Sequence, residues 1–312
     1  MHWGTELDTQ PRTDAPTLLR AGARVLAEAD VPSPDADVAV LLAHAWGIDS
    51  ATLSRRRLFA EAVPAAVAAR FAHLIAERAR RIPLQHLTGI AHFRRLELRV
   101  GPGVFVPRPE TELLVGEVLD HLGGAGIPDT PLIVDLCSGS GAIALSIGLE
   151  HPGARVIGVE REEAALAWSQ ANLESLDLGA SHVELVSGDA TTVAVDRPEL
   201  IGTVDVVVSN PPYVPDAAVP RDPEVRDHDP AAALYGGTTG LEVPALIAAQ
   251  AAQLLCPGGL FAMEHAEDQG EGVREMLART PGLSDAATFP DYTGRERYTV
   301  ARRQGRPARE TR

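Results

Sequence analysis

The residues with the clearest chemical potential are Asn210, Pro211, Pro212 and Tyr213, which follow an apolar run typical of a buried strand. Neither proline has an N–H group, so the chain can neither continue a sheet ladder nor begin an ordinary helix here. The sequence therefore predicts a stiff turn that presents carbonyl oxygens and few donors. Such a turn suits a planar NH2 group. The Asn210 side-chain oxygen and the Pro211 carbonyl can each accept one of its hydrogens, and the Tyr213 ring can lie against its face.

This turn has a chemical use, because an amide or aryl nitrogen is a poor nucleophile whose lone pair is delocalised. Two acceptors on its hydrogens draw electron density toward the nitrogen and fix the direction of its lone pair. A strong electrophile held in line could then react without a dedicated base. The alternative is a proline turn that only ends a strand. A second motif favours the chemical interpretation, and we take all four residues of the turn as candidate catalytic and substrate-binding residues.

The second motif lies upstream, where the apolar segment 132–136 is followed by a loop of small residues and then by a segment typical of a helix. Strand, glycine loop and helix in this order form a nucleotide-type binding turn. Glycines let a ligand approach the backbone, and N–H groups at the start of the helix point into the cleft. Alone, this pattern also fits a dinucleotide oxidoreductase. The candidate binding residues of the loop are Cys137, Ser138, Gly139, Ser140 and Gly141.

Three acidic residues, Asp135, Glu160 and Asp189, stand at the ends of three successive expected strands. An acid at the end of the second strand commonly binds ribose hydroxyls, and Asp135 could meet a cationic or amine group. Three acids suit S-adenosylmethionine, which has a positive sulfonium and no phosphates, and they suit a pyrophosphate poorly. The sequence therefore predicts an S-adenosylmethionine site that includes these acids, the small-residue loop and Asn210. For each acid the alternative is a helix cap or a solvated loop charge.

Together with further segments, these motifs resemble the glutamine N5-methyltransferases that modify class 1 peptide chain release factors. The resemblance extends from about residue 17 to about residue 303. It rests on segments 83–89, 102–114, 137–141, 210–213, 264–270 and 291–297. Asn-Pro-Pro-Tyr alone also occurs in nucleic-acid amine methyltransferases, and its combination with Pro107–Glu112 is far more specific.

The resemblance implies methyl transfer to the glutamine of a Gly-Gly-Gln loop, with S-adenosylmethionine as cofactor, a class 1 release factor as partner and no metal. The cofactor would lie on 137–141, Glu160 and Asp189, and the substrate amide on 210–213. The implied fold is α/β, a Rossmann-like class I S-adenosylmethionine-dependent methyltransferase domain with a seven-stranded sheet and a terminal antiparallel hairpin, plus a small N-terminal helical domain.

Four positions depart from the family pattern. Cys137 stands where the family normally has glycine, and a positive φ is more strained there for cysteine. Glu160 replaces the usual aspartate and is one methylene longer. Ala190 stands where a large aromatic residue often lies near the adenine, and it cannot stack. Asp229 stands before Pro230, where the family usually has glutamate.

The domain organisation follows from periodicity and turn signals. Helical spacing at 17–29, 35–46 and 64–81 predicts a helical domain, and Ser33 followed by Pro34 is typical of a helix start. Alternating apolar residues then predict a hairpin between the domains. We expect a helical domain at 1–84 with about 16 flexible residues at its start, a hairpin linker at 85–108, a catalytic domain at 109–303 and a disordered tail at 304–312.

The segment that leads into the catalytic domain carries three further candidate substrate-binding residues, Phe105, Arg108 and Glu110. We expect Arg108 and Glu110 to pair or to brace the cleft, and a purely structural clamp is the alternative. Val214–Gly240 lacks clear periodicity and is long for a plain connection, as binding loops and lids commonly are. It follows the proline turn directly, so we expect it to cover the substrate side.

Composition limits the remaining possibilities. The 312 residues carry a net charge of −15, and residues 109–312 hold 14 Arg against 32 Asp and Glu, which argues against tight binding of bare nucleic acid. We see no apolar stretch long enough for a membrane span and no signal peptide. The two cysteines do not have the spacing of a metal site, and so few cysteines give no disulfide framework. This is what we expect of a protein in the reducing cytoplasm. We expect a cytoplasmic monomer that binds neither membrane nor nucleic acid directly.

Three other functions stay open at this point. A related enzyme that methylates a glutamine of a ribosomal protein would have the same motifs. A DNA or RNA amine methyltransferase should bring a basic groove or a recognition domain, and neither is visible. A cofactor-binding scaffold without activity is disfavoured by the intact proline turn, although Cys137 and Ala190 leave room for weak cofactor affinity.

Overall fold

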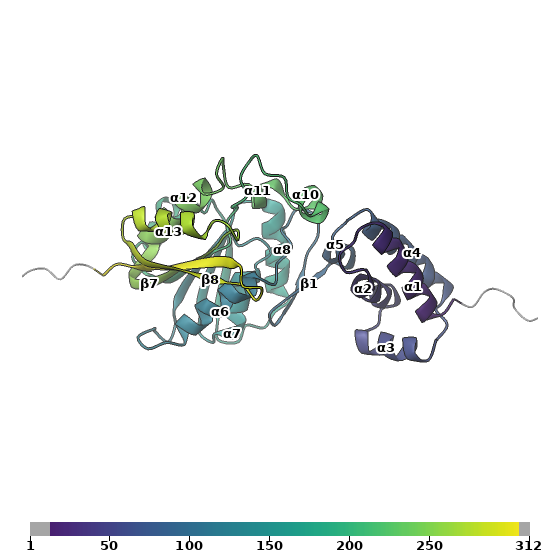
Figure 1. Ribbon diagram of the computed structural model, residues 1–312. Coiled ribbons are helices and arrows are strands. Elements are labelled where there is room, and N and C mark those ends of the chain that lie inside the picture. Colours follow the sequence, from purple (N-terminus) through teal and green to yellow (C-terminus); the bar gives the residue numbers. More distant parts are fainter. Residues whose placement is uncertain (1–12, 306–312) are drawn as a thin grey trace, which may run out of the picture. The chain divides into compact units, whose positions relative to one another are not determined.

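The computed structural model describes residues 13–305, and the chain divides between Gly89 and Ile90 into two compact units (Figure 1). Residues 1–12 of the predicted flexible start and 306–312 of the predicted tail lie outside the described residues. None of the helices within 13–305 is long and apolar enough to cross a membrane.

The first unit is helical, as predicted. Its helices are α1 (Ala15–Glu28), α2 (Pro34–Trp46), α3 (Ser50–Leu58), α4 (Ala65–Ala79) and α5 (Leu84–Thr88). Asp14 caps α1 by accepting the Thr17 N–H at 2.7 Å, which satisfies one of the free donors of the first turn. Ser33 precedes α2 as predicted, but its side chain makes no capping hydrogen bond, and Pro34 fills the first turn instead.

The core of this unit is apolar except for one buried ion pair. Leu41, Leu42 and Phe71 are almost fully buried between the helices. Arg78 on α4 donates to Asp37 on α2 at 2.7 Å, and both side chains are buried. Removing either partner would leave a buried charge uncompensated, so this pair is costly to break.

The second unit is built on a seven-stranded sheet with the order β5-β4-β3-β6-β7-β9-β8. Its strands are β3 (Leu132–Leu136), β4 (Arg155–Glu160), β5 (His182–Ser187), β6 (Val204–Ser209), β7 (Leu255–Glu264), β8 (Leu283–Pro290) and β9 (Glu296–Arg303). The first five run parallel, and β9 pairs antiparallel with both β7 and β8. The predicted α/β fold with a terminal antiparallel hairpin is thereby confirmed.

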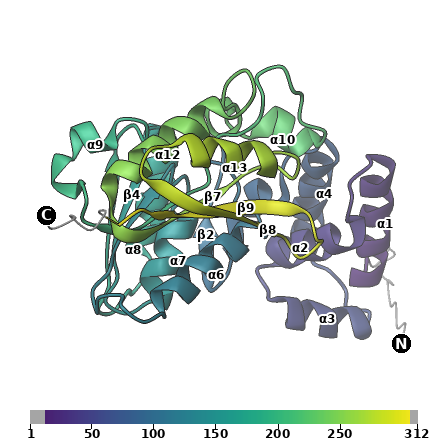
Figure 2. The same ribbon diagram turned by 60° about the vertical axis from the view of Figure 1, so that its left-hand side comes forward.

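Helices cover both faces of this sheet (Figures 1 and 2). One face packs against α6 (Thr111–Leu122), α7 (Ala142–Glu150) and α8 (Glu163–Glu174), and the other against α9 (Val193–Asp196), α12 (Glu242–Leu254) and α13 (Gly270–Arg279). A short 3-10 helix, η1 (Pro198–Leu200), follows α9. Because strand side chains alternate, neighbouring residues such as Ile133 and Val134 enter opposite cores.

Two segments lead from this scaffold to the site. The predicted hairpin forms from β1 (Ile90–Phe93) and β2 (Leu96–Arg99), and its buried side chains join the core that packs against α6. The segment 214–240 contains two short helices that the sequence did not predict, α10 (Pro223–His228) and α11 (Ala231–Leu234). They lack an apolar stripe of their own because each has only four to six residues.

Candidate active site

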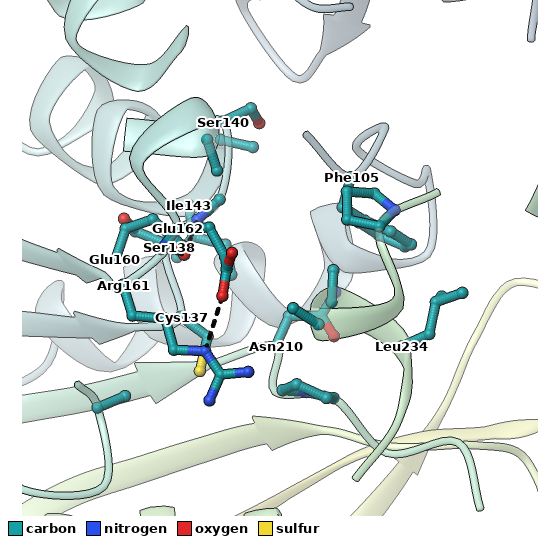
Figure 3. A pocket seen from close by; sticks show the side chains of 18 of the residues that line it. Phe105, Cys137, Ser138, Ser140, Ile143, Glu160, Arg161, Glu162, Asn210 and Leu234 are labelled. Atoms are coloured by element: carbon teal, nitrogen blue, oxygen red, sulfur yellow. Dashed lines mark hydrogen bonds and ion pairs between the residues drawn. The ribbon is translucent and has the colours of Figure 1, made fainter. Parts of the chain in front are cut away.

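A cavity of about 240 Å³ lies where β3, β4 and β6 end, and every residue of its wall belongs to the second unit (Figure 3). Ligands of open α/β sheets bind outside the carboxyl ends of the strands. Figure 3 shows Cys137, Ser138 and Glu160 on one side of the pocket and Phe105 and Leu234 on the other, with Asn210 between them. The cavity therefore has a loop side and a turn side.

The loop between β3 and α7 takes its shape from unusual backbone angles. Cys137 has φ of +67°, Gly139 +56° and Gly141 +82°. Around Gly139 there is open space, so the backbone angle rather than crowding makes glycine suitable. The N–H groups of Cys137 and Ser138 both donate to the Val159 carbonyl, at 3.0 and 3.1 Å. Burial raises the pKa of the Cys137 thiol to about 12, so it stays neutral and unreactive at neutral pH.

Glu160 connects this loop to the end of β4. Its two carboxylate oxygens accept the N–H groups of Gly139 and Glu162, each at 2.8 Å. A carboxylate has about four acceptor positions, so capacity remains for two hydroxyls of a ligand. The side chain is buried yet belongs to the cavity wall. At the rim, Arg161 pairs with Glu162 at 3.1 Å, the dashed contact in Figure 3.

The other two predicted cofactor acids lie in different places. Asp189 lines the cavity, and one of its oxygens accepts the backbone N–H and the hydroxyl of Thr191, which lower its pKa. Asp135 is fully buried outside the wall and accepts the Ala144 N–H at 3.1 Å under the start of α7. Burial raises its pKa well above the usual value. This contact with the first turn of α7 resembles the helix cap of the alternative interpretation, and the cofactor role of Asp135 stays a prediction.

The loop side fits S-adenosylmethionine in its donor and acceptor set. Glu160 and Asp189 offer carboxylate oxygens for hydroxyls and for positive charge, while Ile143, Val159 and Ala190 supply apolar wall. The guanidinium of Arg161, which could attract a phosphate, is already paired with Glu162. Ser140 also lines the cavity, so four of the five predicted loop residues are in the wall, and Gly141 lies just behind them.

The proline turn forms the opposite side. Asn210, Pro212 and Tyr213 line the cavity, and Pro211 is buried next to them. The Asn210 amide nitrogen donates to the Thr111 hydroxyl at 3.3 Å, which leaves its side-chain oxygen as an acceptor. The Asn210 side-chain oxygen is therefore available as an acceptor in the cavity wall.

The turn is held from behind by the end of β7 and the residues after it. The Tyr213 hydroxyl donates to Glu264 at 3.3 Å, and the Tyr213 carbonyl accepts the Gln269 amide at 2.8 Å. Burial raises the pKa of Glu264 to about 7 and also raises the pKa of Tyr213. His265 is fully buried, hydrogen-bonded to Ala266 and Thr299, and absent from the wall, so it is a structural residue.

Of the two roles expected for Arg108 and Glu110, pairing with each other or bracing the cleft, the structure does not show the pairing. Its guanidinium binds Asp229 at 2.6 Å, and it lies over the Phe105 ring at 5.0 Å from the centroid. The Asp229 side chain is completely buried, so it requires a charged partner, whereas Glu110 lies at the start of α6. Phe105 and Arg108 line the cavity and Glu110 does not. Asp229, one of the four positions that depart from the family pattern, is thus the anchor of this arginine.

Segment 214–240 contributes Val225, Leu234 and their neighbours to the cavity wall, as expected for a cover. It is fastened to the proline turn, because the Val214 N–H donates to the Leu234 carbonyl and the Gly236 N–H to the Val214 carbonyl, at 2.8 and 2.9 Å. A Cβ at Gly236 would collide with the Pro212 carbonyl oxygen. The cover and the turn therefore form one packed wall.

Sequence analysis gave no individual role to Thr111, Gln269 or Glu264, although all three lie in segments that carry the family resemblance. Thr111 lies in the specific segment after Pro109, and Glu264 ends a strand at the same sheet edge as the site. The position of Glu264 at this edge could have predicted that it lies near the site, because the carboxyl ends of parallel strands lie at the same edge of a sheet. The hydrogen bonds themselves join residues 51 to 99 positions apart.

Two family patterns match the chain. The PrmC N-terminal domain matches residues 17–89, and the Methyltransferase small domain matches residues 101–222. The first matched region lies within the helical unit. The second matched region includes the small-residue loop 137–141 and the proline turn 210–213.

Curated relatives match nearly the whole chain. The release factor glutamine methyltransferase of Streptomyces coelicolor is 45% identical over 89% of this chain and 94% of its own length. Those of Bifidobacterium longum and Mycolicibacterium smegmatis are each 43% identical, over 91% and 93% of this chain and 98% of their own lengths. Solved structures also match part of the chain. A 16S rRNA methyltransferase of T. Thermophilus gives a TM-score of 0.46 at 23% identity, covering 70% of this chain and 50% of that one.

Proposed function

The chain belongs to the release factor glutamine methyltransferase family, and we propose that it transfers a methyl group from S-adenosylmethionine to the side-chain amide nitrogen of a glutamine in class 1 peptide chain release factors. The target is the glutamine of the Gly-Gly-Gln motif, and its methylation supports translation termination. The observation that carries this proposal is the Asn210 amide. Its nitrogen is engaged by Thr111, so its oxygen is left to accept an NH2 group beside the cofactor loop.

The chemistry requires an activated amide, because a free glutamine nitrogen is a weak nucleophile. When bound, S-adenosylmethionine would supply a methyl group on a cationic sulfonium, which is a strong electrophile. The N–CH3 bond would form as the S–CH3 bond breaks, S-adenosylhomocysteine would leave as a neutral thioether, and the amide nitrogen would lose one of its two hydrogens as a proton to solvent. Asn210 and the Pro211 carbonyl accept the two amide hydrogens, which raises electron density on the nitrogen and fixes its lone pair. Tyr213 lies against the flat face of the amide. The turn is a preorganised acceptor site because its own hydrogen bonds hold it from behind.

The remaining residues of the site position the two sides of the cavity. Glu160 holds the loop through Gly139 and keeps acceptor capacity for ribose hydroxyls. Arg108 and Asp229 tie the entry segment to the cover over the turn side.

We infer further that the protein acts in the cytoplasm as a monomer on a protein substrate and does not bind nucleic acid directly. The acidic surplus of residues 109–312 supports the last point, since nucleic-acid binding needs cationic surface. The runner-up substrate is a glutamine of a ribosomal protein. A DNA or RNA amine is a third choice, because the same turn accepts any planar NH2 group.

Incubation with labelled S-adenosylmethionine tests the proposal. The acceptors, in separate reactions, are a release factor, its Gly-Gly-Gln→Gly-Gly-Ala variant, ribosomal protein and DNA. We expect label on the wild-type release factor and none on its variant. Label on ribosomal protein or DNA instead would keep the amine chemistry and overturn the substrate. Cofactor binding without label on any acceptor would favour a scaffold.

A further inference from the structure

The orientation of Asn210 is decisive for the proposed reaction, and shape alone does not set it. The oxygen and the NH2 group of an asparagine side chain have nearly the same size, so the amide could be turned over without steric cost. Turned over, it would present hydrogens to the hydrogens of the substrate amide. Some other group must therefore select which end faces the cavity.

Thr111 contacts the amide nitrogen but cannot make this selection by itself. The Asn210 nitrogen lies 3.3 Å from the Thr111 hydroxyl oxygen, and Thr111 is buried at the start of α6. A hydroxyl has one hydrogen and two lone pairs, so it can accept from an NH2 group or donate to a carbonyl oxygen. Its choice depends on where its own hydrogen goes.

Glu264 is the nearby group that can take that hydrogen. Its side chain is 2% exposed at the end of β7, and although burial raises its pKa, the neighbouring Thr111 hydroxyl acts to lower it. An ionised carboxylate only accepts hydrogen bonds. One oxygen already accepts the Tyr213 hydroxyl at 3.3 Å. The other, Oε2, has no partner of standard geometry within the described residues, so acceptor capacity is left for Thr111.

We propose that Glu264 is a positioning residue that orders a chain of hydrogen bonds, from Asn210 to Thr111 to its own carboxylate, and thereby turns the Asn210 oxygen toward the substrate. The same carboxylate fixes the Tyr213 ring through its hydroxyl. This inference rests on the proposed function, because it explains how the amide-binding turn is kept in its accepting state.

Burial and the charges around Glu264 place the pKa of its carboxyl group near neutral pH. Arg297 on β9 favours the charged form, while burial and Glu110 at the start of α6 oppose it. Arg297 is itself held by Asp291 at 3.1 Å. The pKa of Glu264 is raised to about 7, so this carboxylate becomes protonated near neutral pH. The protonated acid can donate its hydrogen to the Thr111 hydroxyl. The Thr111 hydroxyl is then able to point its own hydrogen at Asn210. We therefore expect kcat to fall as pH drops below about 7.

Glu264→Gln tests the assignment because it keeps the shape and adds an NH2 donor. We expect kcat to fall roughly 10- to 100-fold, with cofactor affinity and thermal stability near the wild-type values and with the acidic limb of the pH profile lost. Glu267→Gln is the matched control, since Glu267 is exposed three residues later and pairs only with Arg295 among the described side chains. An acidic limb of the pH profile that survives in Glu264→Gln, where no carboxylate is left to titrate at this position, would overturn the proposal.

Variants of Thr111 distinguish the proposed chain of hydrogen bonds, here called the relay, from a purely structural role of Glu264. Thr111→Val should reduce kcat as Glu264→Gln does, and the double variant should be little worse than either single one, because both break the same chain. Thr111→Ser keeps the hydroxyl and should retain most of the activity. Losses that multiply in the double variant would mean that Glu264 acts independently of Thr111, which contradicts the relay.

One readout needs no substrate and therefore separates this inference from the proposed function. In an NMR experiment with isotopically labelled protein, the Asn210 NH2 protons should show a contact with the Thr111 methyl group. The contact should disappear in Glu264→Gln. If it persists there, the relay is wrong even when release factor is methylated. If the wild type shows it but fails to methylate release factor, only the proposed function fails.

Discussion

The two sides of the cavity are built differently. On the loop side, Glu160 contacts Gly139 and Glu162, which are 21 and 2 positions away, and Asp189 contacts Thr191, 2 positions away. On the turn side, the contacts of Asn210 and Arg108 span 99 and 121 positions. The loop side is therefore encoded by strand–loop–helix units, and the turn side is assembled from distant segments by the completed fold.

This difference has a functional meaning in the family. A cofactor site made of local units can form wherever a strand meets a glycine loop. An acceptor for one particular amide needs its polarity and position set from several directions, which only long-range contacts supply. Variants on the loop side should therefore change cofactor binding, and variants on the turn side should change turnover.

The largest effect is expected for Asn210→Ala, which removes the acceptor itself. We expect kcat to drop roughly 1000-fold, the size of losing a preorganised hydrogen-bond partner of the reacting group. Cofactor affinity measured by calorimetry should change little, because the loop side stays intact. Equal loss of both quantities would mean that Asn210 has a structural role that spans both sides.

Glu160→Ala should show the opposite pattern. It removes the acceptor of two backbone N–H groups and the expected partner of the ribose, so cofactor affinity should fall roughly 10- to 100-fold. Turnover at saturating cofactor should be far less affected. Glu163→Ala, an exposed acid at the start of α8, is the control and should bind cofactor normally. Unchanged affinity in Glu160→Ala would remove its assigned role.

Gly236→Ala probes whether the cover supports the turn. The added methyl group would meet the backbone carbonyls of Pro212 and Gly240, neither of which can rotate away. We expect kcat to fall roughly 10-fold through displacement of the turn, with cofactor affinity retained. Gly116→Ala in α6 meets only ordinary contacts and should keep wild-type kcat. Wild-type kcat in Gly236→Ala would separate the cover from the turn.

The smallest of these effects is expected for Asp229→Asn, which keeps the shape and removes the charge that holds Arg108. Since the pair ties the entry segment to the cover, we expect KM for the release factor to rise roughly 3- to 10-fold with little change in kcat. Asp227→Asn, two residues earlier in an exposed pair with Arg226, is the matched control. A KM that rises equally in both would point to general surface charge.

The parts that the sequence predicts well are those with local signals. Apolar runs predicted β3, β4, β5 and β6, and the alternation of apolar residues before residue 106 predicted the β1–β2 hairpin. Both patterns are local, because they follow from the direction in which successive strand side chains point. The proline turn was also evident, since Pro211 and Pro212 restrict the backbone whatever surrounds them. α10 and α11 were not predicted, because helices of one turn depend on contacts made elsewhere.

In the candidate site, too, the residues with local signals were predicted and the long-range contacts were not. The loop residues were identified from their spacing, and the structure puts four of five in the wall. Of the two roles expected for Arg108, the structure does not show pairing with Glu110, because the buried Asp229 binds the guanidinium, whereas Arg108 does line the cleft. Asp135 carries the same lesson, since a strand-end acid can face the helix start above it instead of the cavity.

Mass spectrometry of the release factor after reaction with the protein and S-adenosylmethionine tests the central claim most directly. The account predicts one added methyl group on the side-chain nitrogen of the Gly-Gly-Gln glutamine, with none after reaction with the Asn210→Ala variant. A methyl group on another residue of the release factor, or an unmodified glutamine alongside a modified ribosomal protein, would contradict it.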